Sequence, residues 1–425
     1  MKQIFGKWWL IPIVAIGLLF GVGWLTVSSM RATRPPAPPP GTPLVYPWGA
    51  MHLDAKHIEP DSDLERSIMA SFESERESSF DPDQDGQREY SILILSGGGS
   101  AGAFGAGFLA GWSQAGTRPD FKIVTGVSTG SLQSTFAFLG PEYDDELKEV
   151  YTLYSTDQIY ERRSLLGAAL GESAYDTAPL KELISRFVNP DVLAAVAAKH
   201  AAGYRLFVGT CNMDTNEFII WDMGAIASSD RPDKLERYRN VLLASSSIPI
   251  LFPPVYFKLE VDGQDYYEMH VDGGVQANIF LRGFMLDLQE KFDEAPLRGD
   301  AELSLYLIRN GMFLETITRE VTEPSSLSIA AATIKQLFNL SNNSSLFRVY
   351  MLAARFNIDF NLAAIPDDAF PDFDVIEFDK AKMRKLYDFA FEQASSGYNW
   401  VKLPPRLDPS EVIQPLHDLD EGANR

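Results

Sequence analysis

The sequence predicts an α/β protein with a mainly parallel central sheet and helices on both faces of that sheet, preceded by an N-terminal transmembrane helix. From residue 90 onward, short apolar runs typical of buried strands alternate with longer segments that have the apolar spacing of helices. An unbroken apolar stretch and a proline-rich segment come before them. A chain of 425 residues, 45% of them hydrophobic, is long enough to bury one large or two medium cores.

The apolar stretch covers residues 8–27 and carries no charge over these twenty positions. At helical rise, this length matches the hydrocarbon thickness of a bilayer. Trp8, Trp9 and Trp24 lie near its two ends, as in the aromatic belts of membrane spans. A cleaved secretory signal is the alternative, although its apolar region usually has about 7 to 15 residues. We therefore expect residues 1–30 to form a membrane anchor that is not cleaved.

Positive charges flank the apolar stretch on both sides. Lys2, Lys7 and the α-amine precede it, and Arg31 and Arg34 follow it. Because the side with more Lys and Arg stays in the cytoplasm, this narrow excess favours a single-pass protein whose bulk lies on the non-cytoplasmic side. If the segment were cleaved as a signal, the protein would instead be secreted.

Residues 31–89 have the composition of a linker that is first proline-rich and then acidic. Residues 34–43 are typical of a stiff polyproline spacer that holds the following domain off the bilayer, although a simple disordered linker fits them equally. Residues 62–79 are compatible with a charged, solvated helix. Residues 81–86 copy the first half of a calcium loop, but the twelfth position is Ile92, where a bidentate Glu is required. We therefore favour a solvated turn there and expect no metal.

A glycine-rich loop follows the first predicted strand, residues 90–96. Unpaired backbone N–H groups at such a loop suit an anion, either a nucleotide pyrophosphate or the oxyanion of an acyl-transfer intermediate. Gly97, Gly99 and Gly102 fit the dinucleotide pattern GxGxxG, which requires an acid at the end of the next strand. Asp120 lies before that strand instead, so the oxyanion is favoured.

The next predicted strand, residues 121–125, leads into residues 126–130, which read Gly-Val-Ser-Thr-Gly, and a predicted helix follows. The pattern GxSxG between a strand and a helix is typical of a nucleophile elbow. Its glycines let two chain segments pass closely, and the serine occupies the strained apex. The sequence thus predicts Ser128 as a nucleophile, with Gly126 and Gly130 as the motif glycines.

A third motif, Asp272-Gly273-Gly274, follows the strand-like run 268–271. It places a carboxylate at a strand end, where catalytic groups of α/β sheets gather, although an isolated Asp-Gly-Gly is more often a turn. A serine hydroxyl needs a base, and an aspartate with a raised pKa can serve. Histidine is the usual base, and His417 is the one candidate by position, which leaves a Ser–His–Asp α/β-hydrolase as the alternative.

Further elements are predicted around this aspartate. Strands are predicted at 204–209, 217–221, 303–308 and 374–378, and helices at 179–188, 233–246, within 325–363 and at 380–394. Alternation of this kind is what a mainly parallel sheet requires, because parallel strands need crossover connections.

Taken together, the glycine loop, the serine elbow and the Asp-Gly-Gly motif resemble the patatin-like phospholipases, whose catalytic device is a Ser–Asp dyad. Residues 175–180 and 244–255 also look similar to that family. The resemblance spans residues 90–285 and implies a patatin-like catalytic domain over this range. Residues 286–425 would then form a C-terminal α/β extension packed on that domain.

The resemblance also implies roles for single residues. Ser128 would be the nucleophile and Asp272 the base. The oxyanion hole would come from the backbone of Gly98, Gly99, Ser100, Ala101 and Gly102. The family usually has Arg or Lys where this chain has Ala101. That departure keeps the main-chain donors but removes a cation that would contact a phosphate, which weakens the case for anionic phospholipid.

We therefore expect a serine-dependent lipid acyl hydrolase, whether phospholipase, lysophospholipase or esterase, that works through an acyl-enzyme and needs no cofactor. A catalytically silent, membrane-tethered binding scaffold is the alternative from another class. The formal charge of −21 argues against nucleic acid as a partner and against electrostatic docking on anionic headgroups. The expected partners are a lipid substrate and, through the N-terminal helix, a membrane. The sequence does not specify the oligomeric state.

Overall fold

The computed structural model describes residues 33–42, 47–48, 50–52, 63–75, 80, 88–281, 301–314, 321–370, 373–405 and 407. The predicted membrane anchor, the calcium-loop-like residues 81–86 and His417 lie outside these ranges. Within them, none of the helices combines the length and the apolar character needed to cross a bilayer. The N-terminal anchor therefore stays a prediction.

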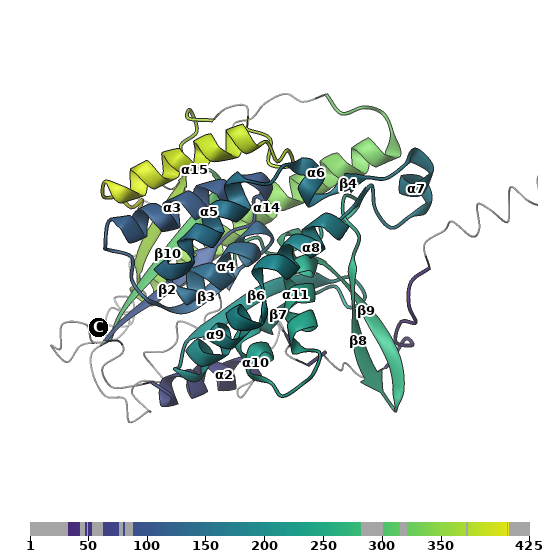
Figure 1. The fold of residues 1–425 in the computed structure, drawn as a ribbon, viewed down its shortest axis with the longest axis horizontal. Helices are drawn as coiled ribbons and strands as arrows, with labels where there is room; N and C mark the ends of the chain where they lie inside the picture. Colours follow the sequence, from purple (N-terminus) through teal and green to yellow (C-terminus); the bar gives the residue numbers. More distant parts are fainter. Residues whose placement is uncertain are drawn as a thin grey trace, which may run out of the picture.

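A nine-stranded sheet of described strands forms the centre of the protein (Figure 1). Its main path runs β1 (Ala50–His52), β7 (Glu217–Asp222), β6 (Arg205–Asn212), β3 (Phe121–Gly126), β2 (Arg88–Leu95), β10 (Ala301–Met312) and β11 (Asp359–Ile365). The five strands from β6 to β11 are parallel to one another. At one edge of the sheet, β7 pairs antiparallel with β6, and β1 pairs antiparallel with β7. The mainly parallel sheet predicted from the alternating pattern is confirmed.

An antiparallel hairpin of β8 (Val255–Val261) and β9 (Gln264–Asp272) joins this sheet on β6. The second half of β6 pairs with β9, whereas its first half pairs with β3. Strand β9 therefore pairs with the same edge of β6 as β3 does, beyond the point where β3 ends. The sheet also contains strands from both sides of the 285 boundary, because β10 pairs with β2 over eight residues.

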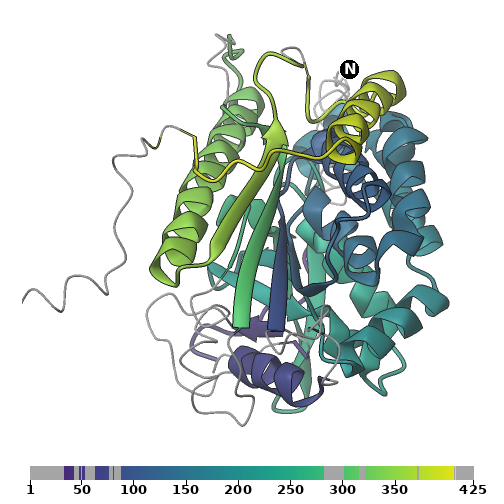
Figure 2. The same cartoon turned by 90° about the vertical axis from the view of Figure 1, so that its left-hand side faces the viewer.

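Helices cover both faces of the sheet, as Figure 2 shows along its edge. One face carries α3 (Gly102–Gln114), α4 (Thr129–Leu139), α5 (Asp144–Thr152), α8 (Ala178–Phe187), α9 (Pro190–Ala201), α10 (Met223–Ser228), α11 (Lys234–Ser245) and α15 (Lys380–Ser395). The long α14 (Ser326–Arg355) lies on the other face, beside β11. The smaller elements are α2 (Asp63–Glu73), α6 (Thr156–Ile159), α7 (Leu165–Leu170), β4 (Glu161–Arg162), β5 (Tyr175–Asp176) and the 3-10 turns η1 (Gly99–Ala101), η2 (Pro141–Tyr143) and η3 (Gly273–Val275).

Two elements predicted from the sequence differ in the structure. Residues 374–378 form no strand, because they cross the glycine loop, where the carbonyl of Val375 accepts the Ser100 N–H at 2.8 Å. Residues 359–363 lie in the stretch predicted to be helical, 325–363, but they belong to β11, which pairs with β10. Both differences have the same cause, since the local pattern of a short apolar run is overridden by the partner that it meets.

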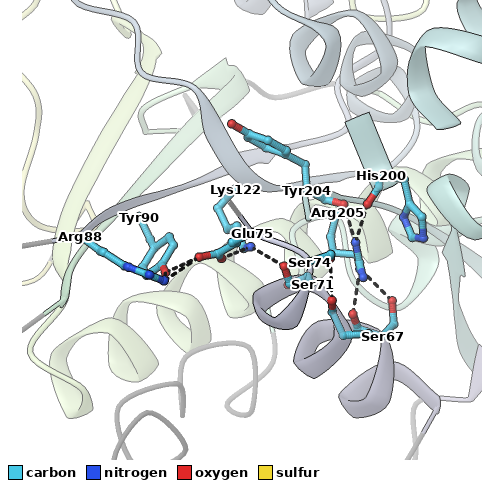
Figure 3. A network of polar contacts seen from close by, with 11 residues as sticks. Ser67, Ser71, Ser74, Glu75, Arg88, Tyr90, Lys122, His200, Tyr204 and Arg205 are labelled. Carbon is cyan, nitrogen blue, oxygen red and sulfur yellow. Dashed lines mark hydrogen bonds and ion pairs between the residues drawn. The ribbon is translucent and has the colours of Figure 1, made fainter. Parts of the chain in front are cut away.

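Helix α2 is not the solvated helix that its charged sequence suggested. Ile68 and Phe72 are buried in the core, and a polar network holds the end of the helix against the starts of three strands (Figure 3). Figure 3 places the carboxylate of Glu75 at its centre. Lys122 of β3 forms an ion pair with this carboxylate and donates to the Ser71 carbonyl at 3.1 Å. Helix α2 and Glu75 are therefore part of the folded core.

The cation and the hydroxyl that complete this network come from β2. Arg88 lies 3.0 Å from the Glu75 carboxylate, and the Tyr90 hydroxyl donates to it at 2.8 Å. Burial lowers the pKa of the Lys122 ammonium to about 8, and the Glu75 carboxylate opposes that shift.

The proline-rich segment begins in contact with the protein. The Arg34 guanidinium binds both carboxylate oxygens of Asp214, at 2.6 and 2.9 Å, and also donates to the Tyr267 carbonyl at 3.0 Å. The Tyr267 N–H in turn donates to the Pro36 carbonyl at 2.8 Å. Residues 34–36 are thus fixed along β9, and any free spacer towards the predicted anchor lies before them.

Candidate active site

Ser128 stands at the end of β3 in a conformation that L-residues rarely adopt. Its φ is +56° and its ψ is −128°, and α4 begins at the next residue. Such backbone strain persists only where the surroundings enforce it. Here the Ser128 N–H donates to the Ser245 hydroxyl at 3.0 Å, and that hydroxyl donates to the Gly209 carbonyl at 2.7 Å. The predicted strand, sharp turn and helix are therefore present, with Ser128 at the apex.

The two outer glycines of the pentapeptide are required by close packing. A Cβ on Gly126 would lie 2.5 Å from the Gly130 carbonyl oxygen, and a Cβ on Gly130 would lie 2.2 Å from the Leu95 carbonyl oxygen. Both distances are well inside van der Waals contact. Any side chain at these positions would force β2 and the elbow apart, so the spacing of the motif is a steric consequence of the turn.

Strand β6 brings Ser128 and Asp272 together. In the ladder, Gly126 of β3 is opposite Val208, and Asp272 of β9 is opposite Thr210. The ends of β3 and β9 therefore meet the same edge of one strand, two residues apart. A serine and an aspartate separated by 144 positions in sequence thus become neighbours at one end of the sheet.

Asp272 is fully buried and has no ion-pair partner within the described ranges. Its Oδ1 accepts the Gly274 N–H at 2.8 Å, whereas no described group donates a hydrogen bond to its Oδ2. Burial raises the pKa of this carboxyl to about 7, and the neighbouring Ser128 hydroxyl and the Gly274 amide oppose the rise. A carboxylate with one oxygen held and the other open can accept a proton near neutral pH.

The glycine loop contains fewer open N–H groups than the sequence suggested. The amide of Ser100 donates to Val375, that of Ala101 to the Gly98 carbonyl at 3.1 Å, and that of Gly102 to carbonyls within η1. The amides of Gly98, which precedes η1, and of Gly99, its first residue, have no hydrogen-bond partner within the described part of the chain. Of the five predicted oxyanion residues, these two therefore have free donors in this conformation.

The loop also packs directly on Ser128. A Cβ on Gly97 would lie 2.9 Å from the Ser128 Cβ, and a Cβ on Gly99, which has a φ of +56°, would lie 2.1 Å from the Val375 carbonyl oxygen. Glycine is needed at 97 for contact with Ser128, and at 99 for both the backbone conformation and the contact.

Asn310 at the end of β10 is a site residue that the sequence reasoning missed. Its side-chain amide donates to the Ser96 carbonyl and to Gln133 Oε1, both at 2.8 Å, and its Oδ1 accepts the Gly105 N–H at 3.1 Å. Gln133 in turn donates to the Gly102 carbonyl at 2.6 Å. The signal was available, since Asn310 lies two positions beyond the apolar run 303–308, near the end of a parallel strand.

Asn278 is a second missed residue, four positions beyond Gly274. Its carbonyl accepts the Gly97 N–H at 3.3 Å, and its own N–H donates to the Ser341 hydroxyl at 3.1 Å. Its Oδ1 is buried without a partner in the described ranges, and a Cβ on Gly97 would lie 2.2 Å from this oxygen. Asn278 therefore fixes the start of the glycine loop and connects it to α14.

The two histidines whose side chains the structure describes have other partners. His270 is buried, with Nδ1 2.9 Å from the Thr210 hydroxyl and Nε2 3.6 Å from the Glu268 carboxylate. Burial lowers the pKa of its imidazole. His200 lies 3.7 Å from Asp222. Neither ring is hydrogen-bonded to Ser128 in the described structure.

Comparison with protein families identifies the part of the chain that contains this site. Residues 93–285 match the family model described as "Patatin-like phospholipase". These residues form a patatin-like phospholipase domain. The family consists of lipid acyl hydrolases that act on ester bonds, and the enzyme class expected from the resemblance is confirmed. Ser128, Asp272 and the glycine loop all lie inside the matched range.

The other comparisons give little information beyond this family match. No curated protein matches the chain. Among solved structures, the crystal structure of VipD from Legionella pneumophila is similar over 73% of this chain and 67% of its own, with 12% identity and a TM-score of 0.35. A similarity of that size supports no argument about the site. Within the described residues, no cluster of three or more His, Cys, Asp or Glu could hold a metal ion.

Proposed function

We propose that the protein is a serine-dependent lipid acyl hydrolase in which Ser128 and Asp272 form a catalytic dyad. The observation that carries the proposal is the state of Asp272, which is fully buried, has no counter-charge among the described residues and receives no hydrogen bond from them on Oδ2, next to the serine. Burying an uncompensated carboxylate is costly, and such an arrangement is typical of a group whose proton affinity is used in catalysis.

The reaction proceeds in two halves. Asp272 Oδ2 accepts the hydroxyl proton as Ser128 Oγ attacks the ester carbonyl, and the amides of Gly98 and Gly99 stabilise the resulting oxyanion. The tetrahedral intermediate collapses, and the alcohol leaves with the proton from Asp272. The same carboxylate then deprotonates a water, which attacks the acyl-enzyme and releases the fatty acid, and the proton returns to Ser128.

Labelling with a fluorophosphonate probe tests whether Ser128 is activated. We expect the wild-type protein to be labelled and the Ser128→Ala variant to remain unlabelled, because the probe reacts with serines that a base deprotonates. Ser131, whose hydroxyl donates to the Ser128 carbonyl at 2.7 Å, provides the matched control, since Ser131→Ala should stay labelled. A wild-type protein that resists labelling would favour a silent binding scaffold.

The role of the base is tested separately. Asp272→Asn should lose turnover, whereas His417→Ala should retain it. Loss of turnover in His417→Ala with full turnover in Asp272→Asn would establish the Ser–His–Asp alternative. A panel of phospholipids, lysophospholipids, acylglycerols and short esters then defines the substrate among lipid esters.

The predicted anchor at residues 1–30 would bring this hydrolase to a bilayer. We propose a single-pass protein with its bulk on the non-cytoplasmic side, tethered through the segment that is fixed along β9 at residues 34–36. Alkaline extraction of membranes and protease protection of a C-terminal epitope test this arrangement. Release of the protein by alkaline carbonate, or an N-terminus that begins after residue 27, would contradict it.

A further inference from the structure

The two halves of α14 have opposite surroundings. From Ser341 onward, buried residues recur with helical spacing, and this half packs against the sheet beside β11. In the first half, residues 326–340, none of the side chains that the structure describes is buried. Leu340 is 67% exposed, Ile329 54% and Leu337 40%. We call residues 326–340 the apolar half of α14.

The C-terminal end of the apolar half lies against the candidate active site. Phe338 packs on the Asp-Gly-Gly motif, so that a Cβ on Gly274 would lie 2.4 Å from its ring. Three residues further on, the Ser341 hydroxyl accepts the N–H of Asn278, which also holds Gly97. The exposed surface is therefore continuous with the elements that position Ser128 and Asp272.

The apolar half of α14 differs in composition from the rest of the chain. Nine of the fifteen residues 326–340 are hydrophobic and Lys335 is the one with a charge, whereas 22% of the whole chain is charged. Phe338 faces the protein at Gly274, whereas the exposed Ile329, Leu337 and Leu340 lie together on the outward side of the helix. An exposed apolar face of this kind, with few charges around it, suits the boundary of a lipid layer, where an interfacial helix buries its apolar face.

We propose that the apolar half of α14 inserts into the lipid surface that contains the ester substrate, so that an acyl chain reaches Ser128 along this helix. The proposal rests on the proposed lipid hydrolase function. A second copy of the chain is the less suitable occupant, because two chains that each carry a formal charge of −21 repel one another. A neutral or zwitterionic surface suits the charge of the chain better than an anionic one.

Fluorescence at a single position tests the insertion without catalysis. Leu340→Cys is introduced into the full-length Ser128→Ala protein and labelled with an environment-sensitive dye, while Cys211 is buried and serves as the background in the parent. Met351→Cys is the matched control, because Met351 is 43% exposed on the packed half of the same helix. With dioleoylphosphatidylcholine vesicles, we expect blue-shifted emission at 340, at least about twofold brighter, and no change at 351.

Each other result of this measurement overturns the proposal. Equal changes at 340 and 351 would mean that the whole protein approaches the bilayer without insertion of the apolar half. No change at either position would mean that the surface meets something other than lipid. A blue shift at 340 that grows with protein concentration in the absence of vesicles would show that a second copy covers it.

Kinetics give an independent test. Leu337→Asp combined with Leu340→Asp should lower hydrolysis of long-chain phosphatidylcholine in vesicles by about tenfold or more, because two charges must then enter an apolar surface. Hydrolysis of a short, monomeric ester should stay within about twofold of wild type. Met351→Asp should leave both rates near wild type. Equal losses on both esters would contradict insertion. A wild-type protein inactive on both would refute the proposed function, and the fluorescence result would still stand on its own.

Discussion

Two carboxylates are buried at opposite ends of the same sheet, and their surroundings differ completely. Glu75 lies among the starts of β2, β3 and β6, with Lys122, Arg88 and the Tyr90 hydroxyl around it (Figure 3). Asp272 lies at the other end, with one amide on Oδ1 and nothing on Oδ2 from the described residues. The fold compensates the charge of Glu75 with two cations, whereas the charge of Asp272 is buried without compensation from the described residues. We infer that the first supports stability and the second supports catalysis.

The largest effect should follow a change at the catalytic end. Asp272→Asn should lower kcat by about a thousandfold or more, because the amide cannot accept the Ser128 proton. Steady-state hydrolysis of a monomeric ester measures this loss, and circular dichroism checks that the fold is intact. Turnover within tenfold of wild type would remove the distinction between the two carboxylates.

The corresponding change at the other end should affect stability instead. Glu75→Gln should destabilise the protein by about 3 kcal/mol, because it leaves the buried Lys122 ammonium without its counter-charge. Denaturant unfolding of the full chain gives the free energy, and activity per folded molecule should stay close to wild type.

A second substitution shows whether the lost charge pair is the cause. Adding Lys122→Met to Glu75→Gln should restore at least half of the lost stability, because the fully buried ammonium is then gone and the remaining cation, Arg88, is partly exposed. If the double variant is less stable than Glu75→Gln alone, then packing rather than charge explains the loss.

The pH profile should show the raised pKa of the catalytic carboxylate. Only ionised Asp272 can act as the base, so kcat/KM should rise roughly tenfold for each pH unit below about pH 6, reach half its maximum near pH 7 and level off above about pH 8. An activity plateau that extends unchanged down to pH 5 would contradict a pKa near 7.

The smallest effect concerns the stability cost of Asp272. Its folded-state pKa of about 7 lies above the ordinary value of 3.8, so the carboxyl costs nothing below pH 3.8, and its charge destabilises the fold increasingly as the pH rises to 7. Asp272→Asn should therefore be more stable than wild type at pH 8, on the order of 1 kcal/mol, because the buried amide donor offsets part of the relief. The difference should vanish near pH 4. If the Asp272→Asn variant and the wild type have equal melting temperatures at pH 8 as well as at pH 4, then Asp272 is not a buried charge.

Much of the fold follows from local patterns. The apolar runs before the glycine loop and before the elbow are β2 and β3, and the run 303–308 lies within β10. Glycines follow the first two runs and mark the ends of β2 and β3 to within one residue, whereas β10 continues past the run 303–308 to Met312. Residues 359–365 and 374–378 show the limit of this reasoning. Both are short apolar runs, and only the contact with β10 in one case and with the glycine loop in the other decides which becomes a strand.

By itself, the sequence determined the motifs whose chemistry is local. The glycines around Ser128 are dictated by contacts within one turn, and a short turn can be recognised without knowing the rest of the chain. Only the tertiary structure decided what connects distant segments. The register of β6 sets Asp272 beside Ser128, hydrogen bonds to Val375 and within η1 leave Gly98 and Gly99 as the open amides, and Asn278 and Asn310 hold the loop. These contacts join residues far apart in the chain, and no local pattern encodes which strand edge or carbonyl each one will meet.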